Sequence, residues 1–310
     1  MPARPLNNRH LRRNVWSRSN LERTMRDFED KTAVVTGGAS GMGLALAECF
    51  AREGMNVVIA DVEEKALREA GARIEALGGS VSLVPTDVAD STAMDHLAEA
   101  TRAAFGAAHV VCLNAGVGGG VGPLQQLSIN DWKWCLDVNL WGVIHGLRVF
   151  LGGLIEQDEG HVVITSSVAG LTSYPNMGPY NASKHAVAAV AETLFAELAE
   201  AGSQVGASCL CPGLVATRIF ESERNRPKEL TDDVETAAPD PALHEFVSAS
   251  FAAAKPPAEV AELVLAAIVE RRFWIQTDEL FREPIRQRHR AIETDGDPPA
   301  RGSILSSYLA

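Results

Sequence analysis

Three side chains suited to proton transfer lie close together in the second half of the sequence. Tyr180 and Lys184 are four residues apart, and Ser167 lies 13 positions before the tyrosine. Residues 179–201 have a helical pattern, so the first two would share a helix face, with the ammonium beside the phenol oxygen. A nearby cation favours phenolate and lowers the pKa of a tyrosine from about 10 toward neutrality. The three residues therefore predict proton transfer to or from an alcohol.

A glycine-rich turn near the start of the chain supports this prediction. The motif Thr36-Gly37-x-x-x-Gly41-x-Gly43 follows an apolar, strand-like run and precedes a helical pattern over residues 42–53. Strand, glycine turn and helix form the context of a dinucleotide site, where the backbone approaches the pyrophosphate and the helix N-terminus faces it. The glycine spacing differs from G-x-G-x-x-G, and such a turn alone can be structural. Combined with the Tyr/Lys/Ser set, it predicts a bound dinucleotide.

Short apolar runs alternate with helical patterns along most of the chain. The expected strands are 33–36, 56–60, 81–85, 109–113, 161–166, 204–211 and 273–276, and the expected helices are 42–53, 63–77, 91–105, 130–155, 179–201 and 257–271. This alternation predicts βαβ units and a doubly wound α/β fold, with helices on both faces of a parallel sheet.

No internal repeat or linker divides this pattern, so one domain is expected over residues 28–278. Residues 1–27 are predicted to be a disordered or spurious N-terminal extension. The first 20 residues contain five arginines and no acid, so a transit peptide is the alternative. Residues 279–310 are polar and are expected to form a C-terminal tail that frays or contacts another subunit.

The motifs, in their order along the chain, resemble those of the classical short-chain dehydrogenases/reductases. Besides the glycine turn and the Tyr/Lys/Ser set, the series contains Asp87-Val88, Asn114-Ala115-Gly116, Asn139, and Pro212-Gly213 with Thr217. The resemblance runs from about residue 28 to about residue 274. It implies a Rossmann-type sheet of about seven strands and an NAD-dependent oxidoreductase that interconverts a secondary alcohol and a ketone. The alternatives are an NADPH-dependent carbonyl reductase and a catalytically silent binding or regulatory protein of the same fold.

The resemblance also implies roles for individual residues. Ser167, rather than its rival Ser166, would hold the substrate oxygen, and Asn139 would bend its helix and bind a water that extends the proton path from Lys184. Thr217 would bond the nicotinamide carboxamide. The predicted catalytic residues are Asn139, Ser167, Tyr180 and Lys184. The predicted cofactor-binding residues are Gly37, Ser40, Gly41, Met42, Gly43, Asp61, Asp87, Val88, Asn114, Ala115, Gly116, Tyr180, Lys184, Pro212, Gly213, Val215 and Thr217.

Asp61, at the end of the second expected strand, bears on the choice of cofactor. An acid there accepts hydrogen bonds from the ribose hydroxyls and repels a 2′-phosphate. The places where NADP-binding relatives usually carry a basic residue hold Val62 and Ser40. The sequence therefore favours NAD. The alternative role for Asp61 is a cap on the following helix.

Composition excludes several other kinds of function. A net charge of −12 argues against a nucleic-acid partner, and we expect no membrane span, because no apolar run approaches the roughly 20 residues that one needs. The five cysteines have no metal-site spacing and are expected to be buried thiols in a reducing compartment. We therefore expect a cytoplasmic protein with a small-molecule substrate and no metal.

The stretch 218–256 interrupts the alternation and would lie at the carboxyl edge of the sheet, where ligands bind. The resemblance identifies it as a substrate lid, and a solvated surface excursion is the alternative. Its apolar residues favour an apolar or aromatic substrate, while Arg224 and Arg226 are candidates to bind a carboxylate. The apolar residues expected on the inner face of this lid are Phe220, Leu230, Phe246, Val247 and Phe251.

The two longest expected helices, 130–155 and 179–201, carry apolar positions that look exposed. In the family these helices pair across a two-fold axis, so the resemblance implies a homotetramer or homodimer. The alternative is a monomer in which these side chains face their own sheet. The positions are Trp134, Trp141, Val187, Leu194 and Leu198.

Overall fold

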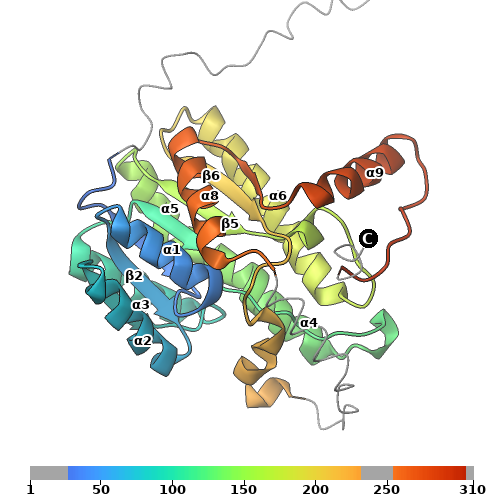
Figure 1. Cartoon of the computed structure of the whole chain (residues 1–310), viewed down its shortest axis with the longest axis horizontal. Helices are drawn as coiled ribbons and strands as arrows, with labels where there is room; N and C mark the ends of the chain where they lie inside the picture. The colour runs from blue at the N-terminus through green and yellow to red at the C-terminus, as the bar shows by residue number, and fades with distance from the viewer. Residues whose placement is uncertain (1–26, 232–253, 305–310) are drawn as a thin grey trace, which may run out of the picture.

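The computed structural model describes residues 27–231 and 254–304 (Figure 1). The predicted N-terminal extension, apart from residue 27, lies outside the described residues. The same holds for residues 232–253 of the predicted lid, which include Phe246, Val247 and Phe251.

Within the described residues, seven parallel strands form one sheet in the order β3-β2-β1-β4-β5-β6-β7. The order reverses between β1 and β4, and this is the point where open α/β sheets bind ligands at the carboxyl ends of their strands. The strands are β1 Thr32–Thr36, β2 Asn56–Asp61, β3 Val81–Pro85, β4 Val110–Leu113, β5 His161–Thr165, β6 Gly206–Cys211 and β7 Trp274–Gln276.

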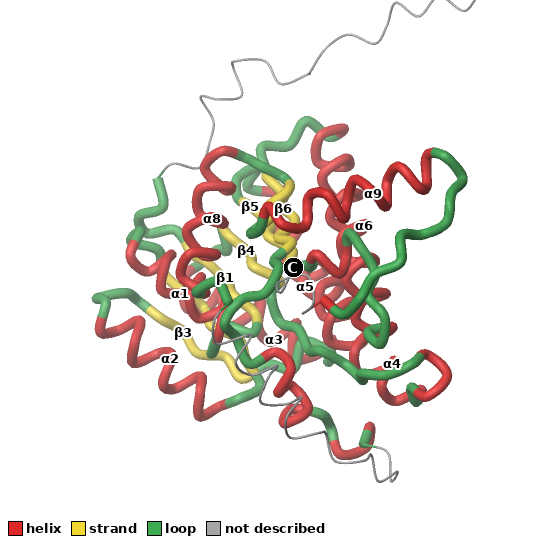
Figure 2. The backbone as a smooth tube through the Cα atoms, turned by 45° about the vertical axis from the view of Figure 1, so that its right-hand side comes forward, coloured by secondary structure: helices red, strands yellow, loops and turns green. Residues whose placement is uncertain are grey.

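Helices cover both faces of the sheet, as Figures 1 and 2 show. Successive strand residues point to opposite faces, so Ala33 and Val35 of β1 pack with α1, α2 and α8, while Val34 packs with α3, α5 and α6. The apolar runs of the central strands are buried on both sides for this reason. The covering helices are α1 Gly41–Arg52, α2 Glu64–Ala76, α3 Ser91–Phe105, α5 Gly142–Glu156, α6 Gly178–Glu200 and α8 Pro257–Glu270.

The predicted doubly wound fold is confirmed, and the predicted strands and covering helices begin and end within two residues of the observed ones. One predicted helix differs in kind. The stretch expected as a single helix over 130–155 consists of α4 Ile129–Leu136, a π-helical segment Asp137–Trp141 and α5. A single π-type turn leaves the apolar pattern largely unchanged, so periodicity does not reveal it.

The C-terminal segment differs from its prediction as well. Residues 279–293 do not fray but form a short 3₁₀ turn, Glu279–Phe281, followed by helix α9, Arg282–Glu293. Phe281 and Ile285 are buried against Val168, Ala169 and Tyr174, which follow β5. Helix α9 lies on the opposite side of the molecule from α2 (Figures 1 and 2). The segment therefore packs against the stretch of chain between Ser167 and Tyr180. The oligomer contact expected of it stays a prediction.

One helical stretch among the described residues, Ile129–Glu156, is long and apolar enough to cross a membrane, contrary to the expectation from the sequence. The stretch contains Lys133, Asp137 and Arg148, and its apolar residues Val143, Phe150 and Leu154 pack on the sheet. A helix that covers a sheet passes the same test of length and composition, so this is weak evidence for a membrane span.

The buried position of Phe281 predicts the stability of the C-terminal segment. Phe281→Ala should lower the free energy of unfolding by about 3–5 kcal/mol, because it removes a large side chain from a packed cluster. Leu280→Ala is the matched control, since Leu280 is 47% exposed while Phe281 is 0% exposed, and it should cost under about 0.5 kcal/mol. Denaturant unfolding measures both. Equal effects would show that the segment does not pack as described.

Candidate active site

The glycine turn between β1 and α1 is closely packed against the end of β4. Gly37 and Gly41 have φ of 62° and 52°, values that favour glycine. A Cβ on Gly43 would lie 2.0 Å from the Gly37 carbonyl oxygen and 2.8 Å from Asn114 Nδ2. Each of these glycines is thus required by backbone conformation or by space. The turn lets the N-terminus of α1, where Ser40 makes no side-chain cap bond, face the cavity described below.

Hydrogen bonds hold the carboxyl ends of β1 and β4 together beside this turn. Thr36 Oγ1 accepts from the backbone N–H of Asn114 at 2.9 Å and of Ala115 at 3.1 Å. Asn114 Nδ2 donates to the Thr36 carbonyl at 3.0 Å. Asn114 therefore joins the two central strands at the point where the strand order reverses.

The predicted proton-transfer residues converge at one end of the cavity. Ser167 follows β5 directly, and its hydroxyl is hydrogen-bonded to Tyr180, which lies on α6. Lys184 Nζ lies 5.6 Å from the centroid of the Tyr180 ring and donates to the Thr165 carbonyl at 3.0 Å. The rival Ser166 instead donates to the Lys184 carbonyl at 2.7 Å. Ser167 is thus the serine whose hydroxyl contacts the phenol.

Asn139 lies in the π-helical segment between α4 and α5 and is completely buried. Its Oδ1 accepts from the N–H of Val117 at 2.8 Å, and its Nδ2 donates to Ser183 Oγ at 3.1 Å. A Cβ placed on Gly116 would lie 3.3 Å from Asn139 Oδ1 and 3.4 Å from Lys184 Nζ. The α-helix is therefore interrupted at Asn139, as expected, and the asparagine lies close to Lys184.

The pKa values of the tyrosine and lysine are set mainly by burial. Burial raises the pKa of Tyr180 to about 12, although the hydrogen bond from Ser167 opposes this, and burial lowers the pKa of Lys184 to about 8. The expected lowering of the Tyr180 pKa is therefore not observed. The ammonium approaches the ring face rather than the hydroxyl, so it does not offset the cost of burying a phenolate. At neutral pH the phenol is protonated and the lysine is mostly charged.

Asp61 stands at the end of β2, at the other end of the cavity. Its carboxylate accepts from the N–H of Ala39 at 3.0 Å and of Glu63 at 3.1 Å. The second bond closes a turn before α2, whose N-cap residue, Glu63, makes no side-chain cap bond, so Asp61 is not the helix cap considered as its alternative role. Burial raises the pKa of Asp61, and the hydrogen bonds from backbone N–H groups oppose that rise. The carboxylate also lines the cavity, where it can meet a ligand.

A cavity of about 620 Å³ connects these two ends. Its volume suits a cofactor or drug-sized ligand, since the pockets that bind such ligands measure about 300–1,000 Å³. The predicted site residues that line it are Gly37, Ser40, Gly41, Met42, Gly43, Asp61, Asp87, Val88, Asn114, Ala115, Gly116, Tyr180, Lys184, Pro212 and Thr217. The glycine cradle, the helix N-terminus and the cavity dimensions together fit a dinucleotide.

Four predicted residues do not line the cavity: Asn139, Ser167, Gly213 and Val215. Asn139 and Ser167 contact residues that form the cavity wall, as described above. The N–H of Gly213 donates to Thr277 Oγ1 at 2.9 Å, and Val215 is buried and bridges to Lys255. Their assignment to cofactor binding stays a prediction.

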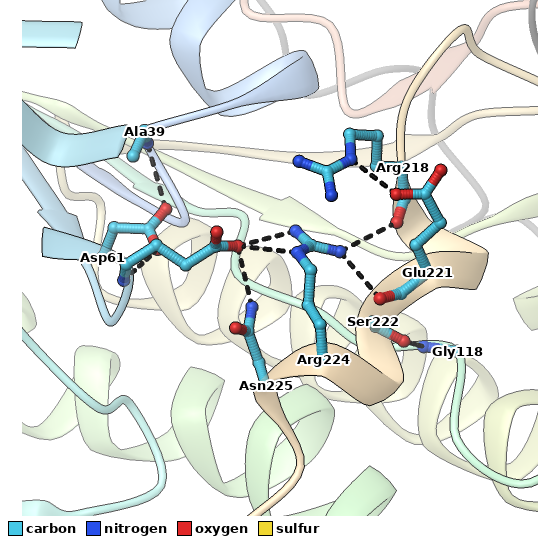
Figure 3. Close-up of polar contacts among 9 residues, drawn as sticks. Ala39, Asp61, Gly118, Arg218, Glu221, Ser222, Arg224 and Asn225 are labelled. Carbon is cyan, nitrogen blue, oxygen red and sulfur yellow. Dashed lines mark hydrogen bonds and ion pairs between the residues drawn. The ribbon is translucent and has the colours of Figure 1, made fainter. Parts of the chain in front are cut away.

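The described part of the predicted lid, residues 218–231, lies over the cavity as two 3₁₀ turns, Ile219–Asn225 and Lys228–Leu230. Leu230 lines the cavity, whereas Phe220 does not. Neither arginine considered for a substrate carboxylate is free for that role. Arg224 pairs with Glu63 at 2.6 Å (Figure 3), and Arg226 pairs with Asp131 at 2.8 Å.

Sequence reasoning missed these lid contacts. Besides the two ion pairs, Ser222 Oγ accepts from the N–H of Gly118 at 3.0 Å (Figure 3). The partners are between 95 and 161 residues apart in the chain. A signal in the sequence that could have pointed to the Arg224 contact is the acid at position 63, two residues after Asp61.

Comparisons with known proteins identify the family. The short chain dehydrogenase family model matches residues 31–228. The chain belongs to the short-chain dehydrogenases. Over 278 residues it is 30% identical to the CLA biosynthesis dehydrogenase/reductase of Lactiplantibacillus plantarum, covering 88% of this chain and 97% of that protein. Over 294 residues it is 30% identical to a C alpha-dehydrogenase of Sphingobium sp. strain SYK-6, covering 92% and 94%.

A solved structure is also similar over most of its length. A short-chain dehydrogenase/reductase from Burkholderia phymatum, in complex with NAD, matches with a TM-score of 0.86 and 43% identity, covering 90% of this chain and 100% of that chain. The resemblance inferred from the motifs is therefore confirmed, and the protein is a member of an oxidoreductase family.

No group of three or more histidines, cysteines, aspartates or glutamates in the described ranges is arranged to hold a metal ion. All five cysteines are buried, as expected, and unpaired.

Close packing at Gly43 predicts a sharp difference between two glycine substitutions. Gly43→Ala should weaken NADH binding by about tenfold or more and lower the free energy of unfolding by about 1–3 kcal/mol, because the new Cβ must displace the Gly37 carbonyl. Gly152→Ala in α5 is the control, since a Cβ there meets nothing within 4 Å. It should stabilise the helix by about 0.5–1 kcal/mol. Thermal unfolding and fluorescence titration with NADH distinguish them, and a harmless Gly43→Ala would contradict the described turn.

Proposed function

We propose that the protein is an NAD-dependent oxidoreductase that interconverts a secondary alcohol and a ketone. The observation that carries this proposal is that Tyr180 and Lys184 line one end of a cavity whose other end is lined by Asp61, and that Ser167 is hydrogen-bonded to Tyr180 behind the cavity wall. A proton donor and acceptor and a hydroxyl that holds an oxygen are the groups that this reaction requires. All four catalytic positions of the family pattern are filled, which argues against the catalytically silent alternative.

Each of the four predicted catalytic residues has its own role in the proposed reaction. NAD, when bound, supplies the hydride acceptor. The Ser167 hydroxyl donates to the substrate oxygen and holds it near Tyr180 Oη. Tyr180 takes the hydroxyl proton during oxidation and returns it to the ketone oxygen during reduction. Lys184 supplies positive charge beneath the Tyr180 ring. The helix between α4 and α5 is interrupted at Asn139, beside Gly116, where a proton can leave the site.

The choice of NAD over NADPH rests on the acid at the end of β2. The Asp61 carboxylate lines the cavity and would repel a 2′-phosphate. The related structure from Burkholderia phymatum contains NAD. An NADPH-dependent carbonyl reductase would need a cation in this position.

The substrate is proposed to be apolar or aromatic. The lid and the facing helix contribute apolar surface to the cavity through Trp134, Ile219, Pro227 and Leu230. The two lid arginines are held by acids, so they do not favour a substrate carboxylate.

The pKa values predict how the two directions depend on pH. Oxidation needs the Tyr180 phenolate, which increases about tenfold per pH unit below its pKa, and the Lys184 ammonium, which is lost above a pKa of about 8. The kcat/KM for oxidation should therefore rise up to about pH 8 and then level. For ketone reduction, which needs the Tyr180 phenol and the Lys184 ammonium, kcat/KM should be flat below about pH 8 and then fall as the ammonium is lost.

Tyr180→Phe should retain NADH binding and lose turnover by about 10²–10⁴-fold, the usual contribution of a general acid or base. Tyr174→Phe is the matched control, because it removes the hydroxyl of another buried tyrosine, one that does not line the cavity. NADH formation with a panel of secondary alcohols measures both. Undiminished turnover in Tyr180→Phe, or no turnover of any alcohol by wild type, would overturn the proposed function.

Assembly as a homotetramer or homodimer in the cytoplasm is proposed from the family and not from the apolar positions singled out in the sequence. Trp134, Val187, Leu194 and Leu198 are buried within the subunit, so the prediction that they are exposed is wrong. They face the sheet or the cavity wall. Trp141 is 50% exposed, as expected, and lies on the π-helical segment beside the site.

Light scattering tests this assembly. A closed oligomer should have two or four times the subunit mass of 33.1 kDa, and Trp141→Glu should dissociate it, because a charge would be buried in an apolar contact. Leu77→Glu is the control, since Leu77 is 43% exposed at the end of α2, which covers the other face of the sheet. A fully active wild-type monomer would contradict the proposal.

A further inference from the structure

An acid that the family pattern does not assign, Glu63, holds the lid over the cavity at its Asp61 end. One of its oxygens, Oε1, accepts from Arg224 Nε at 3.0 Å, from Arg224 Nη2 at 2.6 Å and from Asn225 Nδ2 at 2.9 Å (Figure 3). All three donors come from the 3₁₀ turn Ile219–Asn225 of the lid. A single carboxylate thus attaches the lid to the loop between β2 and α2.

The guanidinium of Arg224 is fixed in this orientation from its other side. Its Nη1 donates to the carbonyls of Glu221 at 2.9 Å and of Arg218 at 3.3 Å (Figure 3). Both acceptors lie in the lid itself, so the lid presents the remaining N–H groups of Arg224 toward the β2–α2 loop. A planar guanidinium held in this way is suited to an anionic partner.

Glu63 and Asp61 form one acidic loop. The N–H of Glu63 donates to Asp61 Oδ1 at 3.1 Å, and both residues line the cavity together with Arg224. Asp61 is the residue expected at the ribose of the cofactor. Arg224 is therefore a cation delivered to the place where an NADP-binding protein needs one.

The other cations that line the described cavity wall are accounted for elsewhere. Lys133 is paired with Asp137, and Arg218 is paired with Glu221. Lys184 belongs to the catalytic end. Of the cations on that wall, Arg224 is the one paired with the loop that carries Asp61.

We propose that Glu63 is a second determinant of NAD selectivity, because its carboxylate occupies the Arg224 guanidinium that a 2′-phosphate would otherwise bind. The inference rests on the proposed preference for NAD and names the residues that enforce it. A 2′-phosphate could recruit Arg224 only by taking the cation away from Glu63, which would keep the Asn225 amide but no positive partner beside Asp61. The side chains of Glu63 and Arg224 are each only 27% exposed, so water replaces the lost partner poorly.

The ionisation of Glu63 agrees with this role. Burial raises its pKa, but the hydrogen bonds from Asn225 and Arg224 outweigh that effect and leave the pKa below its usual value. The acid is therefore charged at neutral pH, as an ion pair with Arg224 requires.

Direct cofactor binding tests the proposal without any substrate. Fluorescence titration of the full chain with NADH and NADPH gives the ratio of the two dissociation constants. Glu63→Gln should improve NADPH binding relative to NADH by roughly tenfold or more, the size of one charge-assisted hydrogen bond. The double variant Glu63→Gln with Arg224→Gln should lose this gain, because the released cation is absent.

Glu64→Gln is the matched control. It removes the same charge one residue later, where Glu64 pairs with Arg68 on the exposed face of α2, and it should leave the ratio within about twofold. Arg224→Gln alone provides a second arm that leaves Glu63 without a cation beside Asp61, and it should shift the ratio further toward NADH. Melting temperatures of all variants show that they are folded.

Three results would overturn the proposal: an equal shift in Glu63→Gln and Glu64→Gln, a shift that persists in the double variant, or a wild type that binds NADPH as tightly as NADH. Turnover of alcohols is measured separately. A protein that discriminates between the two cofactors as described but oxidises no alcohol would support this inference and contradict the proposed reaction.

Discussion

The site depends on the close approach of the first glycine turn to the end of β4. Thr36 and Asn114 bond the two central strands together, and the turn above them has no room for a side chain at Gly43. This contact places the N-terminus of α1 at the point where the strand order reverses. It also fixes the position of Gly116, whose lack of a side chain leaves room for both Asn139 and Lys184. The two ends of the cavity are thereby built on one rigid edge of the sheet.

Burial and charge act against each other at the catalytic end. Enclosing Tyr180 and Lys184 raises the pKa of the phenol to about 12 and lowers that of the ammonium to about 8. Both shifts disfavour the charged forms, as expected for groups removed from water. The hydrogen bond from Ser167 to Tyr180 opposes the first shift.

At the cofactor end, charge is organised by pairing across distant parts of the chain. The lid is attached to the β2–α2 loop through Glu63 and Arg224 and to α4 through Arg226 and Asp131. Arg226 is 9% exposed and also lies over the Trp134 ring, 5.4 Å from its centroid. Partly buried ion pairs of this kind resist screening by salt more than surface pairs do. They give the charged segment 218–231 a defined position over the cavity.

Local patterns in the sequence determined the order, type and bounds of the strands and of the covering helices, because apolar periodicity reports which residues face a core. Most of the site residues predicted from motif spacing likewise line the cavity. Other features arose only from tertiary contacts. The π-helical segment at Asn139 leaves the periodicity intact, and the burial of Phe281 depends on a surface formed after β5. The pairing of Glu63 with Arg224 joins residues 161 positions apart. Ion pairs and pKa shifts depend on distance and burial in three dimensions, and neither quantity is encoded in the local order of residues.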